Sequence, residues 1–155
     1  MVNMRLKAMF FDSKAVMSAM DQATRKVFGH FGGLVRKIAI RSIQTRGEGS
    51  SSPGQPPYDK LGAKRRVENR RRKAEGRAKA KGGFKGLKHI LYAYEPASRA
   101  VIIGPASNRT RSLTIPEILE EGADPSRRVA ARPFMGPAFM KAKQKLPAMW
   151  AGSIK

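Results

Sequence analysis

Residues 13–38 read SKAVMSAMDQATRKVFGHFGGLVRKI, and their apolar side chains recur at steps of three and four residues. Because an α-helix completes a turn about every 3.6 residues, side chains at this spacing share one face. Asp12 or Ser13 can cap the first turn with a side-chain oxygen. The pattern therefore predicts one long helix with a single buried stripe, formed by Val16, Met20, Ala23, Val27, Phe31, Leu34 and Ile38.

Three glycines, Gly29, Gly32 and Gly33, interrupt this stripe. Each costs up to about 1 kcal/mol relative to alanine inside a helix. They fit either ordinary core packing or a kink or close helix crossing at this point.

A short strand is predicted before the helix, at Met4–Phe11, where charged and apolar residues alternate. This segment has no uninterrupted apolar run, so a signal peptide is not expected. No stretch of the chain approaches the roughly 18 apolar residues of a membrane span, so we expect no membrane partner.

Between residues 45 and 61 the composition changes to glycine, serine, proline and glutamine, which predicts an extended loop. A basic run follows at residues 63–85, balanced only by Glu68 and Glu75. Because like charges repel, we expect this run to be mobile, or helical only when a partner neutralises it. Its candidate contacts to a partner or to DNA phosphates are Lys64, Arg65, Arg66, Arg70, Arg71, Arg72, Lys73, Arg77, Lys79 and Lys81.

The pattern changes to strand after the basic run. Residues 87–94 and 100–103 are rich in aromatic and β-branched side chains, and residues 95–99 supply turn chemistry, which together predict a β-hairpin. Pro116 and Gly122 then bracket a short helix, because proline suits the first helical turn and glycine the position after the last one.

The C-terminal part is predicted to contain a strand at Val129–Arg132 and a helix that Pro137 opens. Pro147 is expected to kink or end this helix. One side of the helix carries Phe139, Ala142 and Leu146.

Together these elements predict one α+β domain over residues 1–155. We expect a small antiparallel sheet, with a long N-terminal helix and a C-terminal helix packed on it. Residues 45–86 are expected to form an extended loop and basic insertion in this domain.

The charge of the chain is strongly unbalanced, with 32 Lys and Arg against 11 Asp and Glu and a formal net charge of +21. This excess is larger than solubility requires, so a polyanion or an acidic surface is an expected partner. Charge alone does not choose among nucleic acid, an acidic membrane face and acidic neighbouring subunits.

The side chains offer little for catalysis. The absence of cysteine excludes disulfides, thiolate metal ligands and cysteine nucleophiles. His30 and His89 lack a second histidine at ligand spacing, so no metal or other cofactor is predicted. Acids such as Asp21 and Glu120 are interpreted as helix caps or surface groups, and we predict that the protein is not an enzyme.

An ordered set of short motifs resembles the tailed-bacteriophage neck proteins, the family described as tail-completion, head-tail joining or minor tail protein Z-type. Each motif alone is common at the ends of strands and in loops. The resemblance lies in the occurrence of all of them, in this order, after a long helix. The motifs are Ser52–Pro57, Leu61–Gly62, Val101–Pro105, Ile118–Gly122, Ala131–Met135 and Pro137–Phe139.

The resemblance implies a virion subunit that forms a ring, with six copies as the expectation, at the head-tail junction. Its implied partners are further copies of the chain, the portal, adaptor and tail-tube or tail-terminator proteins, and the genomic DNA that passes through the ring. The implied location is the virion neck, and the host cytoplasm during assembly. Loops, rather than a catalytic cleft, would carry this function.

The chain departs from the usual pattern of the family it resembles at the basic run, which separates Leu61–Gly62 from the hairpin. Three interpretations of this run stay open: docking on acidic proteins, contact with DNA phosphates, or a solvated arm that only adds charge. No aromatic residues interleave the run as stacking platforms for bases would.

A second candidate surface, for subunit contact, comprises Arg132, Phe134, Met135 and Trp150. Phe134 and Phe139 are nevertheless expected in the core, where such residues occur more often, whereas Trp150 is expected at an interface. The rival function is that of a free nucleic-acid-binding protein, ribosome- or nucleoid-associated, because a pI near 11.3 is typical of such proteins. Against this rival, the chain lacks a known recognition motif.

Overall fold

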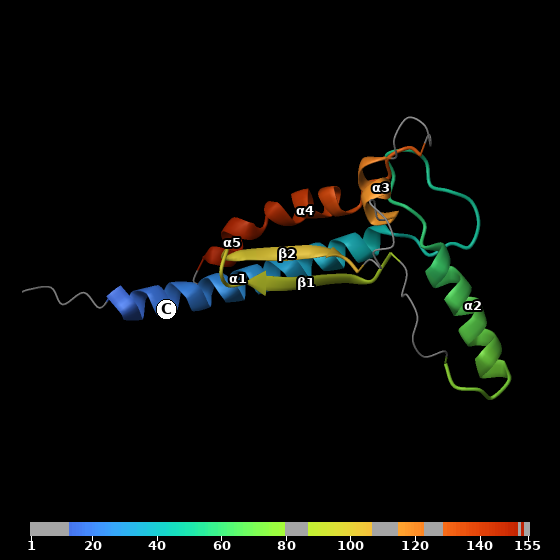
Figure 1. Ribbon diagram of the computed structural model, residues 1–155, viewed down its shortest axis with the longest axis horizontal. Coiled ribbons are helices and arrows are strands. Elements are labelled where there is room, and N and C mark those ends of the chain that lie inside the picture. The colour runs from blue at the N-terminus through green and yellow to red at the C-terminus, as the bar shows by residue number, and fades with distance from the viewer. Residues whose placement is uncertain (1–12, 80–86, 107–114, 123–128, 152, 154–155) are drawn as a thin grey trace, which may run out of the picture.

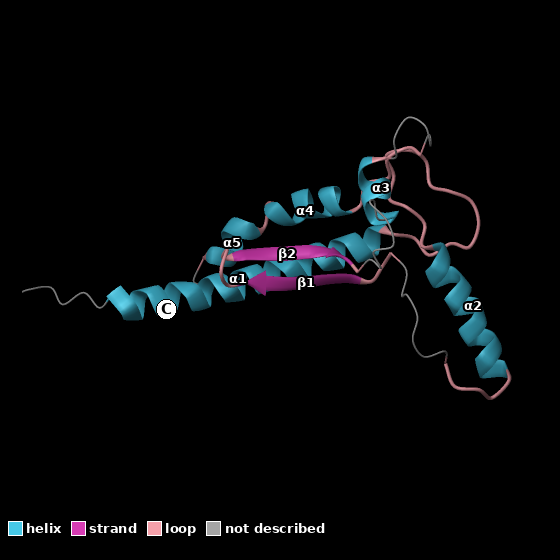
Figure 2. Ribbon diagram, in the orientation of Figure 1, coloured by secondary structure: helices cyan, strands magenta, loops and turns pink. Residues whose placement is uncertain are grey.

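The computed structural model describes residues 13–79, 87–106, 115–122, 129–151 and 153. This part of the chain has the α+β arrangement that the sequence predicts, with a two-stranded antiparallel sheet (Figures 1 and 2). The strand predicted at Met4–Phe11 lies outside it. The elements in order are α1 (Ser13–Ser42), α2 (Lys60–Ala74), β1 (Ile90–Glu95), β2 (Ala100–Pro105), α3 (Ile115–Glu121), α4 (Met135–Lys143) and α5 (Leu146–Trp150).

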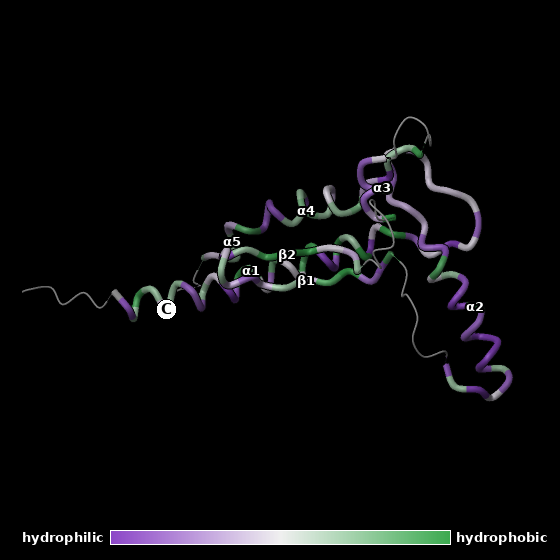
Figure 3. Tube along the Cα trace, in the orientation of Figure 1, coloured by the Kyte–Doolittle hydropathy of each residue, from purple (hydrophilic) through white to green (hydrophobic). Residues whose placement is uncertain are grey.

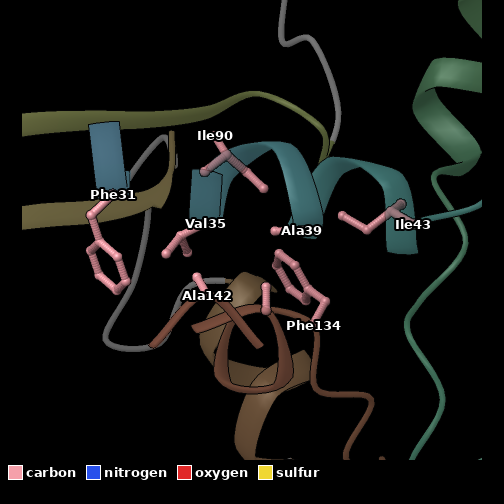
Figure 4. Close-up of a cluster of buried hydrophobic side chains, with 8 residues drawn as sticks. Phe31, Val35, Ala39, Ile43, Ile90, Phe134 and Ala142 are labelled. Carbon is pink, nitrogen blue, oxygen red and sulfur yellow. The ribbon is translucent and has the colours of Figure 1, made fainter. Parts of the chain in front are cut away.

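Helix α1 is the centre of the packing, because the hairpin and α4 both pack on it (Figure 4). The predicted stripe is confirmed in its middle, where Ala23, Val27 and Phe31 are buried, whereas Val16 and Met20 at its start are exposed. Leu34 and Ile38 are only partly buried, and the core continues through Val35 and Ala39 instead. Ile90 reaches this stripe from β1 and Phe134 from the start of α4. The core is therefore a single apolar seam along α1.

The predicted hairpin is confirmed, with Tyr92 paired to Ile103 and Ala93 paired to Ile102. Tyr92 lies over Gly32 of α1, where a Cβ atom would come within 2.7 Å of the Tyr92 ring. The glycine at position 32 thus permits a close approach, although between a helix and a strand rather than between two helices.

The short helix predicted before Gly122 is confirmed as α3. Gly122 has a φ of +87°, the left-handed conformation that favours glycine after a helix. The predicted strand at Val129–Arg132 is wrong: none of its four residues is in a strand. The backbone N–H of Arg132 donates to the Leu119 carbonyl at 2.6 Å, and the Ala131 carbonyl accepts from Gly54, so the segment bonds to a helix end and a loop.

The predicted C-terminal helix is present as α4 and α5. It begins at Met135, two residues before Pro137, and it breaks between Lys143 and Leu146. Phe139 was expected in the core but is 43% exposed, with its ring in a T-shaped contact with Phe31.

A carboxylate from another helix closes the start of α4. Glu120 accepts backbone N–H groups of Phe134, Met135 and Gly136, at 3.0, 3.1 and 2.6 Å. A carboxylate there also suits the positive end of the helix dipole. The sequence suggested that Glu120 is a cap, but not that it caps a helix other than its own.

Much of the basic run is helical, because residues 60–74 form helix α2 instead of continuing the extended loop. Asp59 caps this helix by accepting the Gly62 N–H at 2.9 Å. Glu68 and Glu75 pair with arginines along it, which offsets part of the repulsion that argued against a helix.

Candidate interaction surfaces

Helix α2 projects from the rest of the molecule (Figure 1) and buries none of its residues. It is the most hydrophilic helix in Figure 3. Of the predicted contact residues, those from Lys64 to Lys73 lie on α2, while Arg77 and Lys79 follow it. Lys81 lies outside the described residues. The structure therefore gathers most of the predicted cations on one exposed arm.

One side of α2 is neutralised by its own acids. Glu68 accepts from Arg72 Nε at 2.9 Å and pairs with Arg71 Nη2 at 3.3 Å. Glu75 pairs with Arg77 Nη2 at 2.8 Å and with Arg71 Nε at 3.7 Å. The hydrogen bond from Arg72, aided by the charge of Arg71, holds the pKa of Glu68 below its ordinary value of 4.5. This side of the arm is thus a network of ion pairs at neutral pH.

The other side of α2 carries cations without acids. Arg66, Arg70 and Lys73 are spaced by four and three residues, which places them on one helical face. All three are exposed, and none forms an ion pair with any residue that the structure describes. About seven residues separate the first from the last, or about 10 Å along the helix axis.

The predicted subunit surface is only partly available. Phe134 is buried in the core of its own chain, so its side chain cannot contact another subunit in this fold. Arg132 donates from Nε to the Ser51 carbonyl at 2.9 Å and from Nη1 to Ala130, which gives it a structural role. Met135 is partly buried against the core, and the Trp150 ring packs edge-on against Phe28. The structure does not join these four residues into one exposed patch.

Other apolar side chains are uncovered, and the sequence did not single them out as surface. The stripe of α1 extends past the body of the molecule, where Val16, Met17 and Met20 are 41–50% exposed (Figure 1). On the hairpin, Leu91 and Ile102 are 53% and 64% exposed. These two lie on the sheet face opposite Ile90, which enters the core.

An apolar cavity of about 390 Å³ opens at the base of α2, beside Leu61, Leu87 and Leu119. Two of the polar side chains that line it are already engaged, since Asp59 caps α2 and Arg132 bonds to the Ser51 carbonyl. The polar lining also includes Ser50, Ser51, Tyr58 and Lys60.

Two further groups of sites are not found among the described residues. No three histidine or acidic side chains there come together as metal ligands. His30 is exposed on α1, and His89 lies half-buried just before β1. No helix in this part of the chain has both the length and the apolar character that crossing a membrane requires.

Two signals in the sequence could have revealed the helical arm. Asp59 precedes a run of good helix formers as an N-cap would, and Glu68 precedes Arg72 by four residues, the favourable order for an ion pair. No comparable signal identifies the role of Glu120, because its partners are backbone groups that lie 14–16 residues away.

Comparison with known proteins adds no relative: no family model matches the chain, and no significant match is found among curated proteins or solved structures. The function must therefore be argued from the surfaces themselves.

Proposed function

We propose that this protein is a non-enzymatic structural subunit of a tailed-bacteriophage neck, where copies of it form a ring that connects the portal or adaptor to the tail. The resemblance of the ordered motifs after residue 50 supports this assignment. The observation that carries the assembly role is the apolar stripe of α1, which is longer than the body that covers it. Exposed apolar side chains on such a stripe are stabilised when a neighbouring molecule buries them.

The neighbour that fits best is a second copy of the chain. The uncovered end of α1 and the outer face of the hairpin are two different apolar surfaces on one subunit. When one surface of a subunit binds a different surface of the next, the contact is heterologous and closes into a ring at a suitable rotation. We therefore assign the contact to Met20 of one copy and Ile102 of the next, together with their exposed apolar neighbours.

Free edges on the hairpin support the same role. The described sheet has two strands, so each strand has one unpaired edge. Unpaired edges in assembly proteins are places where another chain adds hydrogen bonds. The purified protein by itself is expected to be monomeric or weakly associated, because completion of the ring needs the neighbouring neck proteins.

Introduced cysteines test the contact directly, because the chain has none of its own. A mixture of Met20→Cys and Ile102→Cys chains, oxidised at high protein concentration, should give a disulfide-linked dimer. A mixture of Met20→Cys and Val67→Cys is the matched control, because Val67 is 68% exposed but lies on α2. Equal cross-linking of the two mixtures would refute the assigned contact.

Electron microscopy of particles of the encoding virus tests the location. The expected result is a ring of this chain at the head-tail junction. Its absence from mature particles, or its recovery on ribosomes, would refute the neck function.

The rival function, a free nucleic-acid-binding protein, is favoured by the net charge of +21. A titration of the isolated protein with duplex DNA of random sequence separates the two functions. Submicromolar affinity at physiological salt would favour the rival, because one subunit of a ring needs only weak contact with DNA.

A further inference from the structure

Helix α2 divides its charges between two faces. Around the helix axis, Glu68 lies about 170° from the mean direction of Arg66, Arg70 and Lys73, when residues advance by about 100° each. The acids therefore neutralise one side of the arm and leave the opposite side cationic. Arg66, Arg70 and Lys73 take no part in the ion pairs that stabilise α2, so their charge is left for another role.

We propose that the face formed by Arg66, Arg70 and Lys73 is a binding surface for the phosphate backbone of a nucleic acid, without sequence preference. The inference concerns α2 in a single subunit and does not depend on ring formation. Duplex DNA carries about one negative charge per 1.7 Å of axis, so the roughly 10 Å spanned by this face meets several phosphates.

The composition of the face favours nucleic acid over an acidic protein. Protein interfaces have tryptophan, tyrosine or arginine anchors that pack into desolvated pockets among apolar side chains, and other charged residues are depleted at their centre. The residues that neighbour the three cations are Gly62, Ala63, Val67, Asn69 and Ala74. Val67 is the large apolar side chain among them and is 68% exposed, but it lies about 90° around the axis from the mean direction of the cations, so it flanks the face instead of occupying its centre. Phosphate binding, in contrast, needs only cations that can reach the backbone.

The position of α2 leaves the face accessible. The helix buries none of its residues and projects from the body, so a duplex can approach it without displacing any part of the core (Figure 1). The ion pairs on the opposite side help to hold α2 in the helical conformation that aligns the three cations. The ion-paired side of α2 thus stabilises the helix on which the cationic side presents its three residues.

The test is a fluorescence anisotropy titration of the full-length protein with a labelled duplex of random sequence, repeated at several salt concentrations. We compare the wild type with the triple variant Arg66→Gln, Arg70→Gln and Lys73→Gln. Glutamine forms helices about as readily as arginine or lysine, so α2 should persist, and circular dichroism checks that it does. The wild type should bind with a Kd of about 10–100 μM at physiological salt, in the range of non-specific binding.

Loss of three phosphate contacts should reduce the slope of log affinity against log salt by about 2.7. Between 50 and 200 mM salt, the wild type should then lose about 40-fold more affinity than the variant does. The matched control replaces Lys26, Lys37 and Arg41, three exposed cations of α1, with glutamine, which removes the same net charge. This control should change the slope by less than 1.

Two results would overturn the proposal. An equal loss of slope in the α1 control would mean that net charge, rather than this face, binds the duplex. Poly-L-glutamate binding as tightly as DNA, with the same sensitivity to the triple variant, would mean that the face docks on acidic proteins instead. Neither result depends on the cross-linking of Met20 to Ile102, so failure of this proposal and failure of the ring contact are distinguishable.

Discussion

Helices α1 and α2 are formed from opposite kinds of sequence and are stabilised in opposite ways. Helix α1 buries an apolar stripe against the hairpin and α4, so its stability is that of the whole fold. Helix α2 buries nothing and is held by the Asp59 cap and by ion pairs. The comparison shows that one chain can contain a helix defined by packing and a helix defined by charge, and that each should respond to a different perturbation.

The largest effect is expected from the core of the packed region. Phe134→Ala should lower the free energy of unfolding by about 3–5 kcal/mol, because it leaves a cavity between α1 and α4. Chemical denaturation followed by fluorescence or circular dichroism measures the loss. Phe139→Ala is the matched control, and it should cost clearly less because that ring is 43% exposed. Equal losses would contradict the assigned core.

A smaller effect is expected from loss of the Glu120 carboxylate, which caps α4. Glu120→Ala removes the acceptor of three backbone N–H groups at the start of α4 and should destabilise the fold by about 1–3 kcal/mol. Thermal unfolding measures the change. Glu121→Ala, at the exposed end of α3, should be nearly neutral, and a similar loss there would contradict the capping role.

Two glycines of α1 test the close approach of the hairpin. Gly32→Ala places a Cβ atom 2.7 Å from the Tyr92 ring and 3.0 Å from Val101, so it should destabilise the fold by about 1 kcal/mol after the gain in helix propensity. Gly29→Ala meets no atom within 4 Å and should stabilise the fold by up to about 1 kcal/mol. Changes of the same sign in both variants would contradict this packing.

The smallest effect on overall stability is expected from the charged helix. Glu68→Gln should reduce the helical signal of the 15-residue α2 in circular dichroism, with little change in the melting temperature of the core. The same loss should occur in the wild type at low pH. Because the pKa of Glu68 is lowered in the fold, its ion pairs persist above pH 4.5 and are lost as the pH falls through the lowered value.

The wild type and Glu68→Gln should therefore differ in helical signal at neutral pH and converge in strong acid. A shift in the melting temperature of the core as large as that of Glu120→Ala would show that α2 belongs to the packed region. That result would remove the distinction between the two helices.

The confirmed predictions rest on patterns that act over short distances in the chain. The three- and four-residue spacing of the stripe predicted α1, and β-branched residues around a turn predicted the hairpin. The prediction for residues 63–85 weighed the repulsion among cations and omitted the capping by Asp59 and the ion pairs of Glu68. The candidate contact residues were identifiable by charge, but not their division into paired and unpaired faces.

By itself, the sequence determined which segments have an apolar side, where glycine and proline end them, and that the chain carries a large excess of positive charge. Only the tertiary structure decided which neighbour covers each apolar side. In the fold, Met20 and Ile102 are exposed and Phe134 is buried in the core. Residues 129–132 form no strand, and their backbone hydrogen-bonds to Gly54 and Leu119. The physical reason is that the spacing of apolar residues specifies which side of a helix or strand is apolar. The residues that cover that side lie far away in the sequence, so local spacing does not identify them.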